Sequence, residues 1–248
     1  EFGKNMGAYS YCFKITQLNY KMAFLRYTDK GELHMYKHKR IFSYNADINK
    51  TAYLNWRMDS GTRQSNLVPF AEGYALAAQK LIEGVLKNNR TKDADILAFP
   101  ILFSINQMIE LYLKAIIWEL EILNEGNIHK HTTHDIKSLL ELMTAKIKKR
   151  ENKSSGLEKH LVAVRNYIEE LYPYITGTDA NKASKLNIDF ARYPFSADLS
   201  PHFYVMTMEN VVVNLENLLY CLISMQESLD SLYCKYEEEI SLKDENYD

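Results

Sequence analysis

Three histidines lie close together near the middle of the chain. His129, His131 and His134 form the pattern H-x-H-x-x-H. Neutral imidazoles are good ligands for zinc or nickel, so this cluster could gather such an ion. No cysteine lies nearby, and a solvated turn with His134 packed at the start of the next helix explains the same pattern. We favour that structural role and expect no metal site.

A second group of residues interleaves positive charge with aromatic rings. Its centre is Tyr36, Lys37, Lys39 and Arg40. Such a composition suits stacking on bases and neutralising phosphates, so we predict nucleic-acid contact here. Tyrosine accounts for 18 of the 248 residues, so chance interleaving is an alternative. In that case the segment is a solvated edge strand whose lysines discourage pairing with another chain.

Composition and missing motifs exclude several classes of protein. The formal net charge of −2 excludes a uniformly basic nucleic-acid-coating protein, so a polyanion would have to meet a local patch. The sequence contains no G-x-x-x-x-G-K-[ST], no G-x-G-x-x-G after a strand and no G-x-S-x-G. We therefore expect no nucleotide cofactor and no other cofactor.

Cysteine usage and hydropathy predict a cytoplasmic location. Cys12, Cys221 and Cys234 are odd in number and widely spaced, which is typical of free thiols in a reducing compartment. We find no charged start followed by an apolar run and a small-residue cleavage site, so we predict no secretory signal. The apolar segment 96–123 carries charged residues such as Glu110 that favour a core helix over a membrane span.

Periodicity predicts a small β-hairpin followed by helices. Two extended runs within residues 20–45 flank Thr28-Asp29-Lys30-Gly31, a turn signal. Helical spacing then begins at Pro69 and again near Pro100. Further helices are predicted from about His134 to Lys149, from Ser155 to the residue before Pro173, and from Pro201 onward, with a frayed acidic tail from Glu237. The connection 173–199 has no helical period, which indicates function or disorder.

Three short stretches carry a family resemblance. FPILFSINQMIELYLKAII at 99–117, HDIKSLL at 134–140 and FARYP at 190–194, before a last long helix, resemble the HEPN superfamily of helical proteins of prokaryotic defence and toxin systems. The likeness covers roughly residues 69–235. It implies a mainly α fold: an antiparallel helical bundle at 66–236, preceded by an extension at 1–65 with the β-hairpin and followed by the acidic tail at 237–248.

The resemblance also implies a reaction. Active HEPN proteins are metal-independent ribonucleases that resemble one another in an R-x(4–6)-H motif, usually assembled across a dimer. Arg165 begins a match, but Glu170, Leu171 and Tyr172 occupy the positions where the histidine is needed. The other candidate pair is Arg192 and His202, whose spacing exceeds that of the motif.

In this interpretation His202 moves a proton as a ribose 2′-hydroxyl attacks the neighbouring phosphate, and Arg192 stabilises the charge that develops. The predicted helix places His202 in the first turn after Pro201, where the helix dipole lowers its proton affinity. Alternatively, Arg192 pairs with Asp189 or Asp198 and His202 is an ordinary surface residue.

Two hypotheses of different class follow. The first is a HEPN-like endoribonuclease of a bacterial or phage defence or toxin system that acts on RNA through Arg192 and His202. The second is a catalytically silent member that binds a protein or nucleic-acid partner through the hairpin and the 173–199 connection. Apolar residues on more than one face of the last helix, such as Val211–Val213, indicate a homodimer in either case, with packing inside the monomer as the alternative.

Overall fold

The computed structural model describes residues 25–27, 33–35, 40–58, 65–151, 156–175, 188–205 and 207–245. These residues are mainly helical, as the sequence predicts. The chain divides into two compact units, Glu1–Tyr53 and Leu54–Asp248. The second unit carries all the long helices and the candidate site.

In its described residues the first unit contains two short strands and one helical turn. β1 (Leu25–Tyr27) pairs antiparallel with β2 (Leu33–Met35), so that Arg26 lies opposite His34. Asp47 caps the 3-10 turn η1 (Ile48–Lys50) by accepting a hydrogen bond from the Asn49 amide. The predicted turn at 28–31 and most of the predicted hairpin lie outside the described residues, so the extent of that hairpin stays a prediction.

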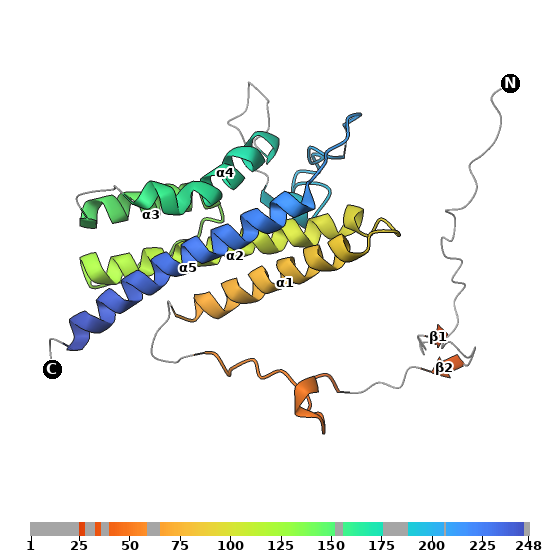
Figure 1. The fold of residues 1–248 in the computed structure, drawn as a ribbon, viewed down its shortest axis with the longest axis horizontal. Helices are drawn as coiled ribbons and strands as arrows, with labels where there is room; N and C mark the ends of the chain where they lie inside the picture. The colour runs from red at the N-terminus through yellow and green to blue at the C-terminus, as the bar shows by residue number, and fades with distance from the viewer. Residues whose placement is uncertain are drawn as a thin grey trace. The chain divides into compact units, whose positions relative to one another are not determined.

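The described part of the second unit consists of five helices and one 3-10 turn (Figure 1). They are α1 (Leu67–Lys87), α2 (Ala94–Glu125), α3 (Ile136–Glu151), α4 (Leu157–Ile175), η2 (Ile188–Ala191) and α5 (Leu215–Glu245). α2 packs against α1, α3 and α5, and α5 also contacts α1 and α4. The unit is therefore a helical bundle organised around α2.

The central position of α2 follows from its composition. Its apolar residues include Ile105, Ala115 and Ile117, which are all fully buried. Because these side chains point to several sides of the helix, α2 needs more than one neighbour. Among the described helices it is long and apolar enough to cross a membrane by length and composition alone. Its contacts with three other helices and its buried glutamates are typical of a core helix.

Two prolines lie inside helices that were expected to begin or end beside them. α2 starts at Ala94 and not near Pro100, and the Ala94 amide donates to Asn89 Oδ1 at 3.1 Å. α4 continues past Pro173 to Ile175. Both prolines are exposed, so water can reach the carbonyl that each leaves without an amide partner. Each prediction erred in a helix boundary and not in the presence of the helix.

The predicted start of the last helix is wrong by about four turns. Residues 201–205 and 207–214 are irregular, and α5 begins at Leu215. Asn214 supplies the cap by accepting the Asn217 amide at 3.1 Å. Val211–Val213 precede it as exposed residues outside regular secondary structure, which agrees with the lower helix propensity of β-branched side chains.

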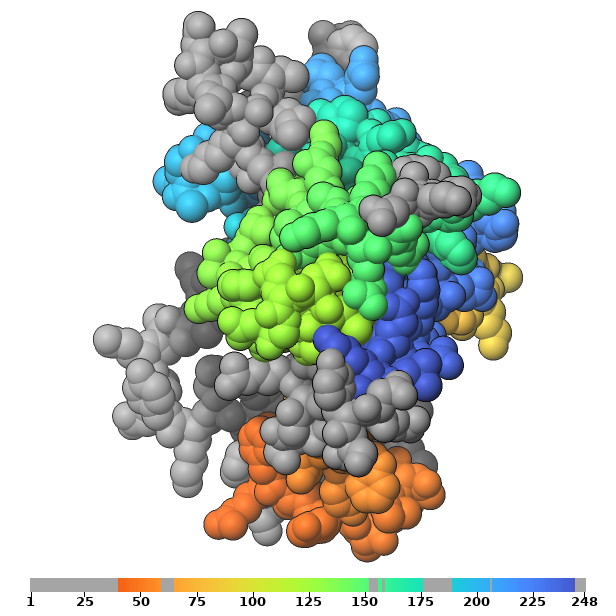
Figure 2. Space-filling model, turned by 90° about the vertical axis from the view of Figure 1, so that its left-hand side faces the viewer, coloured from red at the N-terminus to blue at the C-terminus, as the bar shows by residue number. Residues whose placement is uncertain are grey.

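The predicted frayed tail is largely helical. α5 continues to Glu245, and its last turns pack against the end of α3. The Tyr236 hydroxyl donates to Glu151 Oε1 at 2.7 Å, and Arg150 pairs with Glu239 at 2.7 Å. Figure 2 shows this end of the bundle, with the green surface of α2 and α3 beside the blue end of α5. These contacts order residues that the sequence alone marks only as acidic.

A matched pair of glycine substitutions tests the end of α2. Gly126 caps α2 in the left-handed region with φ of 68°, whereas the exposed Gly84 lies inside α1 with open space around it. We expect Gly126→Ala to lower the free energy of unfolding by about 1 kcal/mol, because a Cβ strains the left-handed conformation. Gly84→Ala should raise it by roughly 0.5–1 kcal/mol. Urea unfolding measures both. An unfolding free energy that Gly126→Ala leaves unchanged would contradict a left-handed cap at Gly126.

Candidate functional site

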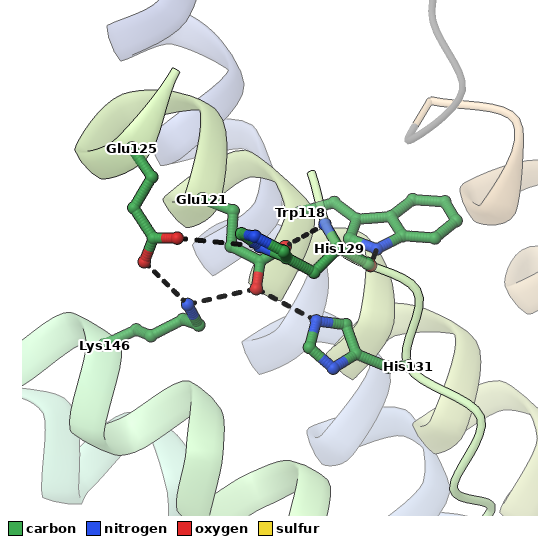
Figure 3. Close-up of polar contacts among 6 residues, drawn as sticks. All are labelled: Trp118, Glu121, Glu125, His129, His131 and Lys146. Carbon is green, nitrogen blue, oxygen red and sulfur yellow. Dashed lines mark hydrogen bonds and ion pairs between the residues drawn. The ribbon is translucent and has the colours of Figure 1, made fainter. Parts of the chain in front are cut away.

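The connection between α2 and α3 is anchored on one buried carboxylate. Glu121 accepts the His129 backbone amide at 2.8 Å, His131 Nε2 at 3.0 Å and Lys146 Nζ at 3.0 Å (Figure 3). Burial alone would raise the pKa of Glu121, but the His129 amide, Lys146 and His131 together lower it. A charged Glu121 therefore holds both the connection and α3 against α2.

The histidine cluster does not converge on one point. His131 turns to Glu121 and His134 to Glu110, while His129 Nδ1 lies 3.6 Å from both Glu121 and Glu125. Trp118 Nε1 donates to the His129 carbonyl at 2.7 Å. In the described part of the chain no group of three or more His, Cys, Asp or Glu side chains is arranged to hold a metal ion. The cluster fastens the connection to α2.

His134 and Glu110 form a dyad with unequal exposure. Glu110 lies on α2 with 7% of its side chain exposed, and its Oε1 accepts Lys114 Nζ at 2.8 Å. The same oxygen lies 2.9 Å from Nδ1 of His134, whose side chain is 63% exposed. A carboxylate at Nδ1 favours the tautomer with the proton on that nitrogen, which leaves Nε2 as a base. A buried carboxylate thus orients an accessible imidazole.

The start of α3 fixes the backbone beside His134. Asp135 accepts the Lys137 amide at 3.0 Å and the Ser138 hydroxyl at 2.6 Å, and the Tyr172 hydroxyl of α4 also donates to it. Burial acts to raise the pKa of Asp135, but the hydrogen bonds from Ser138, Tyr172 and the Lys137 amide lower it. Asp135 is therefore the charged cap of α3, and the rigid helix start holds His134 next to it.

Glu110 and His134 line a cavity of about 280 Å³. α2, the start of α3, the end of α4 and η2 surround it. Its other polar lining residues are Asn106, Gln107, Tyr172, Asp189 and Arg192. An oriented histidine and an arginine therefore share one cavity.

Arg192 reaches this cavity from the residues that follow η2. It forms an ion pair with Asp189, and its guanidinium carbon lies 6.0 Å from the Phe103 ring centre and 5.5 Å from that of Tyr193. The bond to Asp189 raises the pKa of Arg192, so the side chain remains charged. It is still 47% exposed, which leaves donor groups accessible to a ligand. The alternative in which Arg192 pairs with Asp189 is thus observed.

His202 lies elsewhere. Only 2% of the residue is exposed, and its ring centre is 6.2 Å from that of Tyr204. Among the described residues its buried Nε2 has no hydrogen-bond partner, and burial lowers the pKa of the imidazole. Because α5 begins at Leu215, His202 is in no helical turn, and the predicted dipole effect does not apply. His202 does not line the cavity that Arg192 lines.

The other residues singled out in the sequence are Arg165 and the basic and aromatic group around Arg40. Arg165 lies on α4 and lines a groove of about 380 Å³ between α3 and α4 that also contains Lys137 and Lys148. Arg40 is exposed in the first unit. Tyr36, Lys37 and Lys39 lie outside the described residues, so nucleic-acid contact by this group stays a prediction.

Two features of the sequence pointed weakly to the dyad of Glu110 and His134. Glu110 is a carboxylate within a strongly apolar helix, and His134 directly precedes the capping Asp135. Either feature alone is explained by a polar helix face or a helix start. Their separation of 24 positions along the chain gives no local spacing to recognise.

Comparisons with protein-family models, curated proteins and solved structures find no match for this chain. The fold defines a mainly α helical bundle, and the argument for a function rests on the geometry of the cavity.

Proposed function

We propose that the chain is a HEPN-like helical protein of a bacterial or phage defence or toxin system that cleaves RNA without a metal ion. One observation carries the proposal. Buried Glu110 holds exposed His134 at a cavity that charged Arg192 also lines. Histidine and arginine are the two residue types that the HEPN resemblance requires, and in this proposal His134 takes the role for which His202 was the candidate in the sequence.

The reaction assigns one role to each side chain. His134 Nε2 removes the proton of a ribose 2′-hydroxyl as that oxygen bonds to the adjacent phosphorus, and the 5′-oxygen leaves with a proton returned by the imidazolium. Glu110 stabilises the imidazolium and its orientation. Arg192 stabilises the negative charge on the phosphorane-like transition state. The products carry a 2′,3′-cyclic phosphate and a 5′-hydroxyl.

The test is incubation of end-labelled RNA with the purified chain in excess EDTA. We expect fragments with 2′,3′-cyclic phosphate ends, identified by mass spectrometry, and strongly reduced cleavage by Arg192→Ala. Arg90→Ala is the matched control, because Arg90 is exposed and does not line the cavity. Intact RNA, or cleavage that requires a divalent ion, would rule the proposal out.

The second candidate is a silent module that binds RNA or a protein. The ion pair of Arg192 with Asp189 and the burial of His202 favour it, because the pair already engages part of the guanidinium and burial keeps His202 from a substrate. The exposed Val212, in the segment before α5, also favours a protein partner, including a second copy of this chain. Binding of RNA that is lost in Arg192→Ala, with no cleavage by the unmodified chain, would establish this candidate. Analytical ultracentrifugation would test the proposed homodimer.

A further inference from the structure

The cavity beside His134 has charges that are balanced in pairs. Glu110 is paired with Lys114, and Asp189 is paired with Arg192. The deeper lining includes Ile136, Ile175 and Phe190, which are almost fully buried and apolar. A neutral and partly apolar interior favours an uncharged ring over a phosphate, because burying an unpaired anion is costly.

Two neighbouring amides on α2 add hydrogen-bonding groups to this interior. The Tyr167 hydroxyl donates to Asn106 Oδ1 at 2.9 Å, which orients the amide and leaves its NH₂ group as a donor. Gln107 lines the same cavity, and its side-chain amide forms no hydrogen bond with another described residue. Together they offer donors and an acceptor to the edge of a heterocycle.

Aromatic side chains supply flat surfaces in the same cavity. Phe103, Tyr172 and Phe190 line it, and the Arg192 guanidinium lies over the Phe103 ring. Bases stack on such rings and on arginine planes when they leave a single strand. A volume of about 280 Å³ is at the small end for ligand sites, so it suits one base and not a duplex.

We infer that this cavity binds one unstacked base of single-stranded RNA, through the Asn106 and Gln107 amides and the aromatic walls. The inference deepens the proposed function and rests on it. The base enters the interior while the neighbouring phosphate lies at the exposed His134 and Arg192. Cleavage would then depend on which base occupies the cavity and would be confined to unpaired RNA.

Binding can be measured separately from cleavage with 2′-O-methyl oligoribonucleotides, which lack the attacking hydroxyl. The probe is a labelled single strand and a series of copies in which each position in turn is abasic, titrated into the unmodified chain by fluorescence anisotropy. We expect affinity to fall about tenfold or more when the base that enters the cavity is removed. Equal affinity across the series, or no binding of any probe, would overturn the inference.

A pair of variants links the effect to the cavity. Gln107→Leu should lower the affinity for the intact probe about three- to tenfold, since one amide hydrogen bond is lost. It should change the affinity for the abasic copy little. Gln226→Leu is the matched control, because Gln226 is a half-buried glutamine of α5 outside this cavity. Equal weakening of both probes by Gln107→Leu would contradict base recognition by this amide.

The outcomes separate the two proposals. Base-dependent binding with no cut of unmodified RNA would retain the base site and discard the ribonuclease. Cleavage with an abasic series of uniform affinity would retain the ribonuclease and discard the base site.

Discussion

His134→Ala should lower the rate of RNA cleavage about 100- to 10,000-fold, because it removes the group that moves the proton. Glu110→Gln should also lower the cleavage rate strongly, though less than His134→Ala. A neutral amide can hold the ring but does not stabilise the imidazolium that forms during the reaction. Both rates are measured under single-turnover conditions with labelled RNA, and circular dichroism verifies the fold of each variant.

Two further histidine variants make this expectation specific. His160→Ala is the matched control, because His160 is exposed on α4 and does not line the cavity. It should leave the rate unchanged. His202→Ala distinguishes His134, which the cavity geometry favours, from His202, the candidate in the sequence. A folded His202→Ala variant that loses all cleavage, beside an active His134→Ala, would restore His202 as the acid/base residue.

In the unmodified chain, ionisation of Glu119 should change the free energy of unfolding by about 3 kcal/mol between low and high pH. Glu119→Gln should remove this pH-dependent contribution. Glu119 is 1% exposed on α2, and its Oε2 has no hydrogen-bond partner among the described residues. Burial, with a smaller effect from Glu237 of α5, raises its pKa from 4.5 to about 7. The nearby Tyr233 hydroxyl donates to Glu237 at 3.2 Å, and no described residue forms an ion pair with Glu119 that would offset its charge.

The direction follows from proton binding. Between pH 4.5 and about 7 the folded chain holds a proton on Glu119 that the unfolded chain has released, so stability falls as pH rises. Above about pH 7 the buried charge carries its full cost. The variant cannot ionise at this position. Its stability relative to the unmodified chain should therefore increase with pH across this window and then level off.

Urea unfolding at a series of pH values measures this difference. Glu227→Gln is the control, because Glu227 is exposed on α5 and its substitution should leave the pH dependence unchanged. A constant difference between Glu119→Gln and the unmodified chain would show that the Glu119 carboxylate has the same proton affinity in the folded and unfolded states.

The contrast between Glu119 and Glu121 marks a limit of sequence analysis. Both are buried glutamates of α2, two positions apart. The pKa of Glu119 is raised, whereas Lys146, His131 and the His129 amide lower that of Glu121. The sequence shows two similar residues. Their opposite behaviour depends on partners from α3 and the preceding connection.

The candidate site was only half predictable for a related reason. Arg192 was identified from a short motif, and the structure places it in the cavity. His134 was assigned a structural role, because an H-D pair before a helix is explained by capping alone. Whether its imidazole also meets Glu110 depends on the packing of the connection against α2, which no local pattern encodes.

The sequence by itself determined the mainly α fold and the presence of the helices around α2, because apolar residues at a 3.6-residue period have to be buried against one another. Only the tertiary structure decided that α5 begins at Leu215, that His202 is buried, and that His134 joins Arg192 at one cavity. Periodicity is a local property that the chain carries in its order of residues. A site is a meeting of distant residues, and packing decides which of them meet.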